Sequence, residues 1–87
     1  MEVTPTIVAL REKAETIRRH ELERTLASLK DLPPHAQRAI EALSASLTNK
    51  LVHPPIAYLK SSGRNGDGAE AGSITTVRQM FSLDEED

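Results

Sequence analysis

Residues 36–51 read AQRAIEALSASLTNKL, and the apolar positions in this stretch decide the fold. On a helical wheel they fall within about 80°, a narrow seam that is typical of helices lying side by side. Small Ala and Ser residues between them permit close approach of a neighbouring helix. We therefore predict a helix from about Pro34 to about Val52 that buries this seam: Ala36, Ile40, Leu43, Leu47 and Leu51.

A wider apolar stripe precedes this seam, from about Thr4 to about Lys30. Thr4 is a good helix N-cap, and Pro5 suits the first helical position because its missing N–H costs no hydrogen bond there. The apolar positions average about 3.7 residues per turn, which favours a straight helix over a strict heptad. They are Ile7, Leu10, Ala14, Ile17, Leu22, Leu26 and Leu29.

Charged residues on this first helix are spaced for local pairing. Glu15 with Arg19 and Glu21 with Arg24 have the i,i+4 and i,i+3 separations that support a helix. Arg18 and Glu21 fall inside the apolar stripe, where they form either a partly buried ion pair or a simple break in the stripe.

Two proline pairs divide the chain. Pro33-Pro34 separates the two helices into a hairpin, because proline cannot donate a hydrogen bond and disfavours helix in the residue before it. By the same rule, Pro54-Pro55 is predicted to end the second helix, with a short helical turn over residues 55–60.

The C-terminal third is predicted to be irregular, then helical. Residues 61–72 hold all four glycines and are interpreted as a flexible linker. A short helix is predicted from about Ser73, with Ile74, Val77 and Phe81 as its apolar edge, and residues 84–87 form an acidic tail. The predicted organisation is a helical core over 1–60, a linker over 61–72, and a short helix with tail over 73–87. The fold class is all-α.

Composition limits the function classes. The chain has 87 residues, 38% of them hydrophobic and 2% aromatic, so its own core is small and a partner that completes it is expected. A net charge of −2 argues against a dedicated nucleic-acid or membrane binder. No apolar run is long enough for a membrane span and no signal peptide is visible, so we expect a cytoplasmic protein.

No residue pattern indicates chemistry. The chain lacks Cys, and His20, His35 and His53 have no metal-ligand spacing. His53 and Lys50 are interpreted as favourable charges at a helix end. Residues 63–68 are Gly-rich but do not read G-x-G-x-x-G. We predict no catalytic, cofactor-binding or metal-binding residue in this chain.

Three stretches resemble the C-terminal domain of bacterial glutamyl-tRNA reductases. Residues 5–22, PTIVALREKAETIRRHEL, resemble the opening of that domain. Residues 47–55, LTNKLVHPP, followed by Leu59-Lys60, resemble its second signature, and residues 77–83, VRQMFSL, its end. The resemblance spans nearly the whole chain apart from the Gly-rich segment.

The resemblance implies a dimerisation domain from a larger enzyme. That family has a catalytic domain with a Cys nucleophile, an NADPH-binding domain and a helical dimerisation domain, and it reduces glutamyl-tRNA to glutamate-1-semialdehyde for tetrapyrrole synthesis. Only the pairing role carries over, since neither the Cys nor a dinucleotide fingerprint is present. The helical hairpin and C-terminal helices would then form an intermolecular bundle in a homodimer. Its predicted interface is Ile7, Leu10, Ile17, Leu22, Leu26, Ile40, Leu43, Leu47 and Leu51.

Two other functions stay open. One is a tRNA-contacting module that uses Arg18, Arg19, Lys50 and His53, although interleaved glutamates dilute the positive potential. The other is a free-standing helical adaptor for an unrelated partner.

Overall fold

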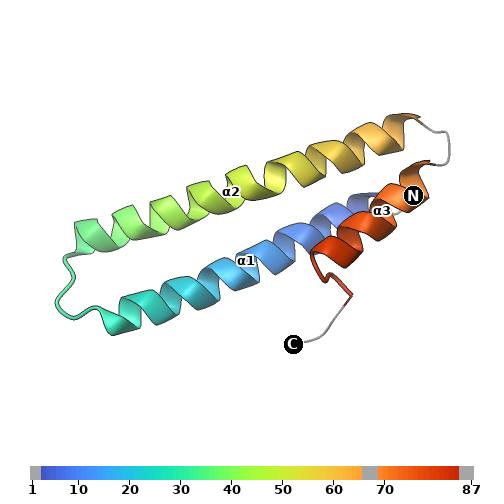
Figure 1. Ribbon diagram of the computed structural model, residues 1–87. Helices are drawn as coiled ribbons and strands as arrows, with labels where there is room; N and C mark the ends of the chain where they lie inside the picture. Colours follow the sequence, from blue (N-terminus) through green and yellow to red (C-terminus); the bar gives the residue numbers. More distant parts are fainter. Residues whose placement is uncertain (1–2, 66–68, 85–87) are drawn as a thin grey trace.

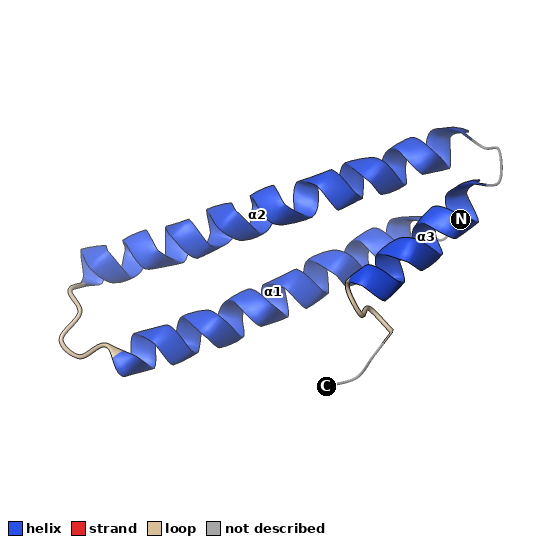
Figure 2. Ribbon diagram, viewed as in Figure 1, coloured by secondary structure: helices blue, strands red, loops and turns tan. Residues whose placement is uncertain are grey.

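Three helices make up the described part of the chain (Figures 1 and 2): α1 over Val3–Ser28, α2 over Pro34–Asn65 and α3 over Ala69–Met80. The computed structural model describes residues 3–65 and 69–84, and at 63–65 and 69–71 it describes the backbone alone. α1 and α2 form a long hairpin, and α3 packs beside its open end, away from the connecting turn (Figure 1). These ranges contain no strand, so the predicted all-α fold is confirmed.

The turn between α1 and α2 forms at Pro33-Pro34, as the sequence predicts. Pro34 opens α2, where a residue without an N–H is tolerated, and the Pro33 carbonyl accepts a backbone hydrogen bond from Ala36 at 3.0 Å. Asp31 has a φ of 59°, a left-handed conformation that short polar side chains tolerate. At the other end of α1, the expected cap is wrong, because the helix already includes Val3 and Thr4 lies inside it.

α2 passes through Pro54-Pro55 without ending. The predicted helix end near Val52, and the separate helical turn over 55–60, are therefore wrong. A proline inside a helix costs about 3 kcal/mol. Val52, Ile56 and Leu59 are buried on both sides of the proline pair and continue one helical stripe through it. Each such burial contributes about 1.5–3 kcal/mol, so packing against α1 and α3 is of the same order as the local cost of the two prolines and offsets it.

The two prolines leave the carbonyl oxygens of Lys50 and Leu51 without the N–H donors that a regular helix supplies four residues later. Pro54 is exposed, so replacing its ring removes little packing. Pro54→Ala should therefore raise the free energy of unfolding by about 1–2 kcal/mol, after allowance for the greater freedom of the unfolded chain. Urea denaturation followed by circular dichroism would measure this, and a loss of stability would contradict it.

The segment between α2 and α3 is shorter than the linker predicted over residues 61–72. Residues 61–65 close α2 and residues 69–72 open α3, while residues 66–68 lie outside the described residues. The side-chain oxygens of Ser62 and Ser73 are 2.8 Å apart in a buried hydrogen bond that joins the two helices. The mobility predicted for this segment stays a prediction.

The C-terminal helix α3 packs against the hairpin with the apolar edge that the sequence predicts. Ile74 and Val77 are buried, although α3 begins four residues earlier than Ser73. After the helix, Ser82 has a φ of 54°, and the Leu83 N–H donates to the Arg78 carbonyl at 3.0 Å. This closure is a common way to end a helix, and it turns Leu83 back onto the core. In the predicted acidic tail, Asp84 is exposed and residues 85–87 lie outside the described residues.

The core lies at the open end of the hairpin, where α3 makes a third layer. Its buried residues form two clusters that share half-buried neighbours such as Phe81 and Leu83. The chain extends 55 × 24 × 15 Å with a radius of gyration of 16.2 Å, against about 12 Å for a compact domain of this length. In the part of the hairpin nearer the turn, therefore, α1 and α2 pack only against each other. The buried apolar residues are Leu10, Val52, Ile56, Leu59, Ile74 and Val77.

Candidate functional site

An exposed apolar stripe runs along the part of the hairpin that α3 does not reach. Four large side chains on α1 and α2 are more than half exposed there: Ile17 at 53%, Leu43 at 60%, Leu47 at 53% and Leu51 at 72%. Exposed side chains of this size, gathered in one patch, typically mark a surface that another molecule covers.

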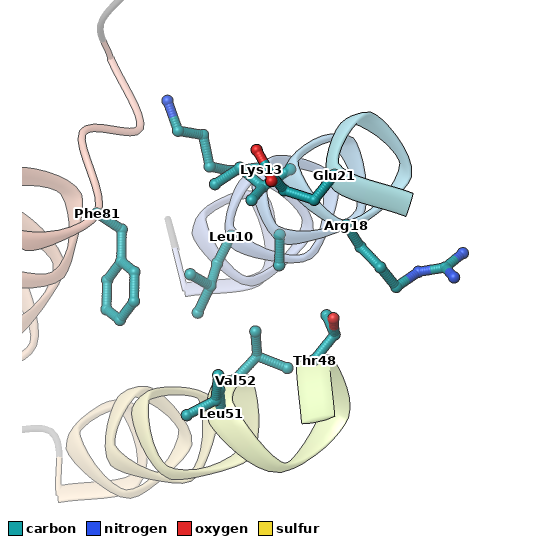
Figure 3. A pocket seen from close by; sticks show the side chains of 10 residues that line it. Leu10, Lys13, Arg18, Glu21, Thr48, Leu51, Val52 and Phe81 are labelled. Atoms are coloured by element: carbon teal, nitrogen blue, oxygen red, sulfur yellow. The ribbon is translucent and has the colours of Figure 1, made fainter. Parts of the chain in front are cut away.

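These residues line a groove between α1 and α2, which we call the hairpin groove. One part, of about 250 Å³, begins at Phe81 and lies over the edge of the core (Figure 3). The other part, of about 420 Å³, continues toward the turn. Both parts are lined by Ile17, Arg18, Glu21, Thr48 and Leu51, so the two are continuous.

The nine predicted interface residues separate into three groups. Leu10 is buried inside the chain and Ile7 packs against both core clusters, so these two belong to the chain's own core. Leu26 is half-buried beyond the groove. The other six line the part of the groove nearer the turn: Ile17, Leu22, Ile40, Leu43, Leu47 and Leu51.

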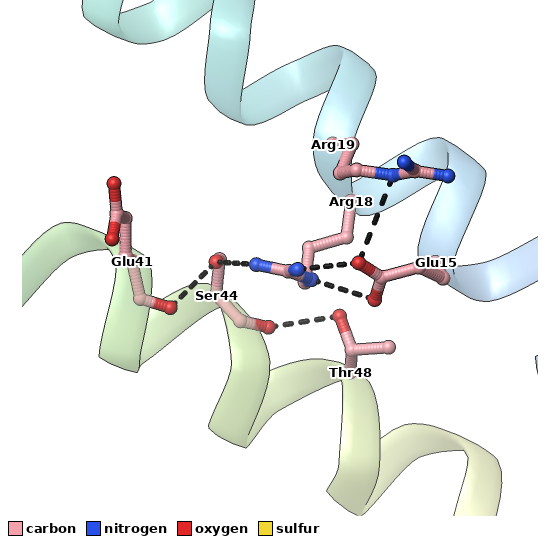
Figure 4. A network of polar contacts seen from close by, with 6 residues as sticks. All are labelled: Glu15, Arg18, Arg19, Glu41, Ser44 and Thr48. Atoms are coloured by element: carbon pink, nitrogen blue, oxygen red, sulfur yellow. Dashed lines mark hydrogen bonds and ion pairs between the residues drawn. The ribbon is translucent and has the colours of Figure 1, made fainter.

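A polar network crosses the hairpin beside this groove (Figure 4). The Arg18 guanidinium donates to both carboxylate oxygens of Glu15, at 2.9 and 2.5 Å, and to the Ser44 hydroxyl on α2 at 3.1 Å. The Ser44 hydroxyl donates to the Glu41 carbonyl at 2.8 Å, and the Thr48 hydroxyl donates to the Ser44 carbonyl at 2.8 Å. Arg18 thus connects α1 to α2 where no apolar core does so.

Of the two readings left open for Arg18 and Glu21, an ion pair between them or a break in the apolar stripe, the ion pair is wrong. Arg18 pairs with Glu15, and Glu21 pairs with Arg24. Arg18 points to the opposite side of α1 from Glu21 (Figure 3), so each base takes the acid three residues before it. The two local pairs predicted from spacing, Glu15 with Arg19 and Glu21 with Arg24, are confirmed.

The network perturbs the titration of its two charged groups. Hydrogen bonds from Arg18 hold the pKa of Glu15 below its ordinary value of 4.5, against a partial desolvation that raises it. The same hydrogen bonds raise the pKa of Arg18. Both groups therefore stay charged around neutral pH.

Glu15→Gln should remove an acid-sensitive part of the chain's stability. A carboxylate whose pKa is depressed by folding stabilises the fold above its unfolded pKa, and this contribution is lost as the pH falls through the folded pKa. The difference in melting temperature between the unmodified and Glu15→Gln chains should be full near about pH 6 and shrink below about pH 4.5. Melts followed by circular dichroism across this range measure it. The exposed Glu23 on the same helix provides a control, Glu23→Gln, and a pH-independent Glu15 effect would contradict the expectation.

Neither metal-binding nor membrane-spanning features occur in the described ranges. No three His, Cys, Asp or Glu side chains gather there, and none of the three helices is long and apolar enough to cross a membrane. His53 lies within α2, so the predicted stabilisation of a helix end by His53 and Lys50 is wrong. The Gly-rich residues 63–68 have no described side chains.

Sequence reasoning missed the polar members of the groove. Ser44 and Thr48 were visible as small polar residues one helical turn apart inside the leucine seam, a spacing that places both on one face. The position of Phe81 at the end of the groove had no such signal, because it depends on how α3 turns back onto α1.

Known proteins resemble the whole chain. The family model of the "Glutamyl-tRNAGlu reductase, dimerisation domain" matches residues 1–83. The glutamyl-tRNA reductase of Geobacter sulfurreducens is 59% identical over 86 residues, which are 99% of this chain and 19% of that protein. That of Trichlorobacter lovleyi is 55% identical over 84 residues, 97% of this chain and 19% of that protein. The chain thus spans about a fifth of the length of these relatives. No solved structure matches it.

Proposed function

Because this chain belongs to the glutamyl-tRNA reductase dimerisation-domain family, we propose that the hairpin groove is the surface through which two copies of the chain pair. The observation that carries the proposal is the apolar face of the hairpin, which α3 covers only at one end. Two copies of this face would cover each other, since a two-fold dimer places the same patch of both subunits in contact. The result would be the intermolecular helical bundle expected from the sequence.

The energetic balance supports pairing. Ile17, Leu43, Leu47 and Leu51 each keep more than half of their surface in water. Burying the remainder contributes roughly 1 kcal/mol or more for each side chain. Eight such side chains in two copies, with the half-buried groove residues beside them, give a contribution of the same order as the association cost of about 4–15 kcal/mol. Good packing then decides the affinity.

For the full-length protein, we propose the activity that the name of the relatives states. The whole protein would reduce glutamyl-tRNA to glutamate-1-semialdehyde with NADPH, in tetrapyrrole synthesis in the cytoplasm. This chain would contribute pairing alone, with the catalytic Cys and the NADPH site in the four-fifths of the relatives' length that it does not span. Pairing would fix two active units relative to each other and to the tRNA.

A tRNA-contacting module ranks second. Arg19 and Arg24 lie on the exposed face of α1, but each is paired with a glutamate of the same helix. Such pairing reduces the positive potential that attracts phosphates. An adaptor for an unrelated partner would also use the groove, but belonging to a dimerisation-domain family favours a second copy of this chain over another protein.

Sedimentation equilibrium of the chain at tens of micromolar tests the proposal. We expect the mass of a dimer, with a melting temperature that falls on dilution as the pairs dissociate, because pairing adds to the stability of the folded chain. A monomer whose melting temperature is independent of concentration would show that the groove does not pair two copies.

A further inference from the structure

One end of the hairpin groove is a pocket with core residues in its wall. It is the part of about 250 Å³ beside Phe81, and we call it the Phe81 pocket (Figure 3). Leu10 and Val52 line it although they are only 1% and 6% exposed, so the pocket reaches the buried core of the chain. Its other apolar lining residues are Ala14 and Ile17 of α1, Leu51 of α2, and Phe81 directly after α3.

Two local features leave this space unfilled. α3 ends at Met80, and the left-handed Ser82, with a φ of 54°, turns the chain so that Leu83 packs on the core. On α1 the half-buried residue beside the pocket is Ala14, whose side chain is a single methyl group. An unfilled apolar space forfeits the dispersion contacts that its walls could make, and an apolar side chain that entered it would recover them.

We propose that the Phe81 pocket receives a leucine side chain of the second copy, an inference that rests on the proposed pairing function. The pocket is continuous with the rest of the hairpin groove through Ile17 and Leu51, so a copy that covers the groove also covers the pocket. Its volume exceeds the roughly 150 Å³ of an apolar cavity that holds a benzene molecule, which is larger than a leucine side chain. Lys13 and Glu21 also line the pocket (Figure 3) and would form the polar rim that surrounds an apolar anchor.

The inserting side chain is Leu43 or Leu47. Both are more than half exposed and line the groove but not the pocket, whereas Leu51 already forms part of the pocket wall. In a two-fold pair each copy would supply one leucine and one pocket, so the contact is made twice. Because interfaces concentrate their binding energy in such buried anchors, the Phe81 pocket would contribute more to the affinity than the open groove beside it.

Ala14→Leu tests the inference by filling the pocket from within. Leucine is nearly as good a helix former as alanine, and the pocket has room for the added carbon atoms, so the monomer should fold and should melt at the same temperature or higher. The leucine of the second copy would then be excluded, and pairing should weaken by more than about tenfold. Sedimentation velocity across a dilution series measures this. Ala57→Leu, the same substitution at an exposed position of α2 outside the groove, should leave the affinity unchanged.

A second substitution identifies the inserting leucine. Adding Leu43→Ala or Leu47→Ala to Ala14→Leu removes from one copy the carbon atoms that Ala14→Leu supplies from the other. At least one of these double variants should recover most of the lost affinity, and that variant identifies the leucine. If circular dichroism shows that Ala14→Leu does not fold, Ala14→Met takes its place with the same expected changes, because the flexible Met side chain fits irregular spaces.

The outcomes separate the two proposals. If the unmodified chain is monomeric, the pairing function itself fails. If it pairs and the folded Ala14→Leu chain pairs with the same affinity, pairing stands and the pocket takes no side chain of the second copy. If Ala14→Leu weakens pairing but neither double variant restores it, insertion of Leu43 or Leu47 is overturned. Loss in Ala14→Leu and recovery in a double variant, with Ala57→Leu unchanged, support the inference.

Discussion

Leu47→Asp should leave the chain monomeric at concentrations where the unmodified chain pairs. Leu47 lies midway along the exposed leucines of α2 and lines the hairpin groove. In the pair it would be covered, so a carboxylate there loses its water and gains no partner. A cost of about 3 kcal/mol or more weakens association by more than about a hundredfold. Sedimentation velocity across a dilution series measures the change.

A matched variant separates this effect from a general effect of charge. Val8 on α1 is 48% exposed and lies outside both parts of the groove. Val8→Asp therefore makes a comparable substitution away from the proposed interface and should leave pairing unchanged. If Leu47→Asp sediments as a dimer with unaltered affinity, the groove is not the interface.

Leu59→Ala should produce the largest loss of folding stability in the chain. Leu59 is 0% exposed and packs in the cluster that joins α2 to Ile74 and Val77 of α3. Its truncation removes buried methyl groups and leaves a cavity, which costs about 2–5 kcal/mol. That is a large fraction of the stability of so small a domain. Urea unfolding followed by circular dichroism gives the value.

The measurement is best made in the Leu47→Asp background, because association otherwise adds to the apparent stability. In that background Leu51→Ala provides the control, as the same substitution on the same helix at an exposed position. It should change stability by less than about 1 kcal/mol. Equal losses for Leu59→Ala and Leu51→Ala would mean that the end of α2 does not pack as described.

The rule that a proline pair ends a helix holds at one pair and fails at the other. At Pro33-Pro34 the rule suffices, because the flanking residues have no buried stripe to continue and a helix can begin at Pro34. At Pro54-Pro55 the same rule fails. Ile56 packs in a cluster with Leu10 of α1, and Leu59 packs with Ile74 and Val77 of α3, so the burial that continues the helix comes from segments far away in the sequence. The spacing of apolar residues predicts both long helices, but the length of α2 depends on tertiary packing, which that spacing does not show.

The candidate site follows the same division. The apolar spacing identified the residues that line the groove, such as Leu43 and Leu47. It could not separate them from Leu10, which has the same residue type and period but lies inside the core. Whether such a residue is buried or exposed depends on how far α3 extends along the hairpin. The apolar periodicity of α1 and α2 does not indicate that length. The choice of Glu15 over Glu21 as the partner of Arg18 likewise depends on the direction in which Arg18 leaves α1.

The proline pair inside α2 has a mechanical consequence. The pair lies within the core cluster of Val52 and Ile56, at the base of the part of α1 and α2 that α3 does not reach, which we call the two-helix arm. The carbonyls of Lys50 and Leu51 lack their helical donors there. Bending stiffness in a helix comes from its ladder of hydrogen bonds, so the arm is most compliant at this point. The arm runs about 30 Å from the prolines to the start of α2, and a bend of about 10° would swing its tip by about 5 Å. In a pair joined through their arms, small angular changes at the prolines would be amplified into large relative displacements of the two bodies.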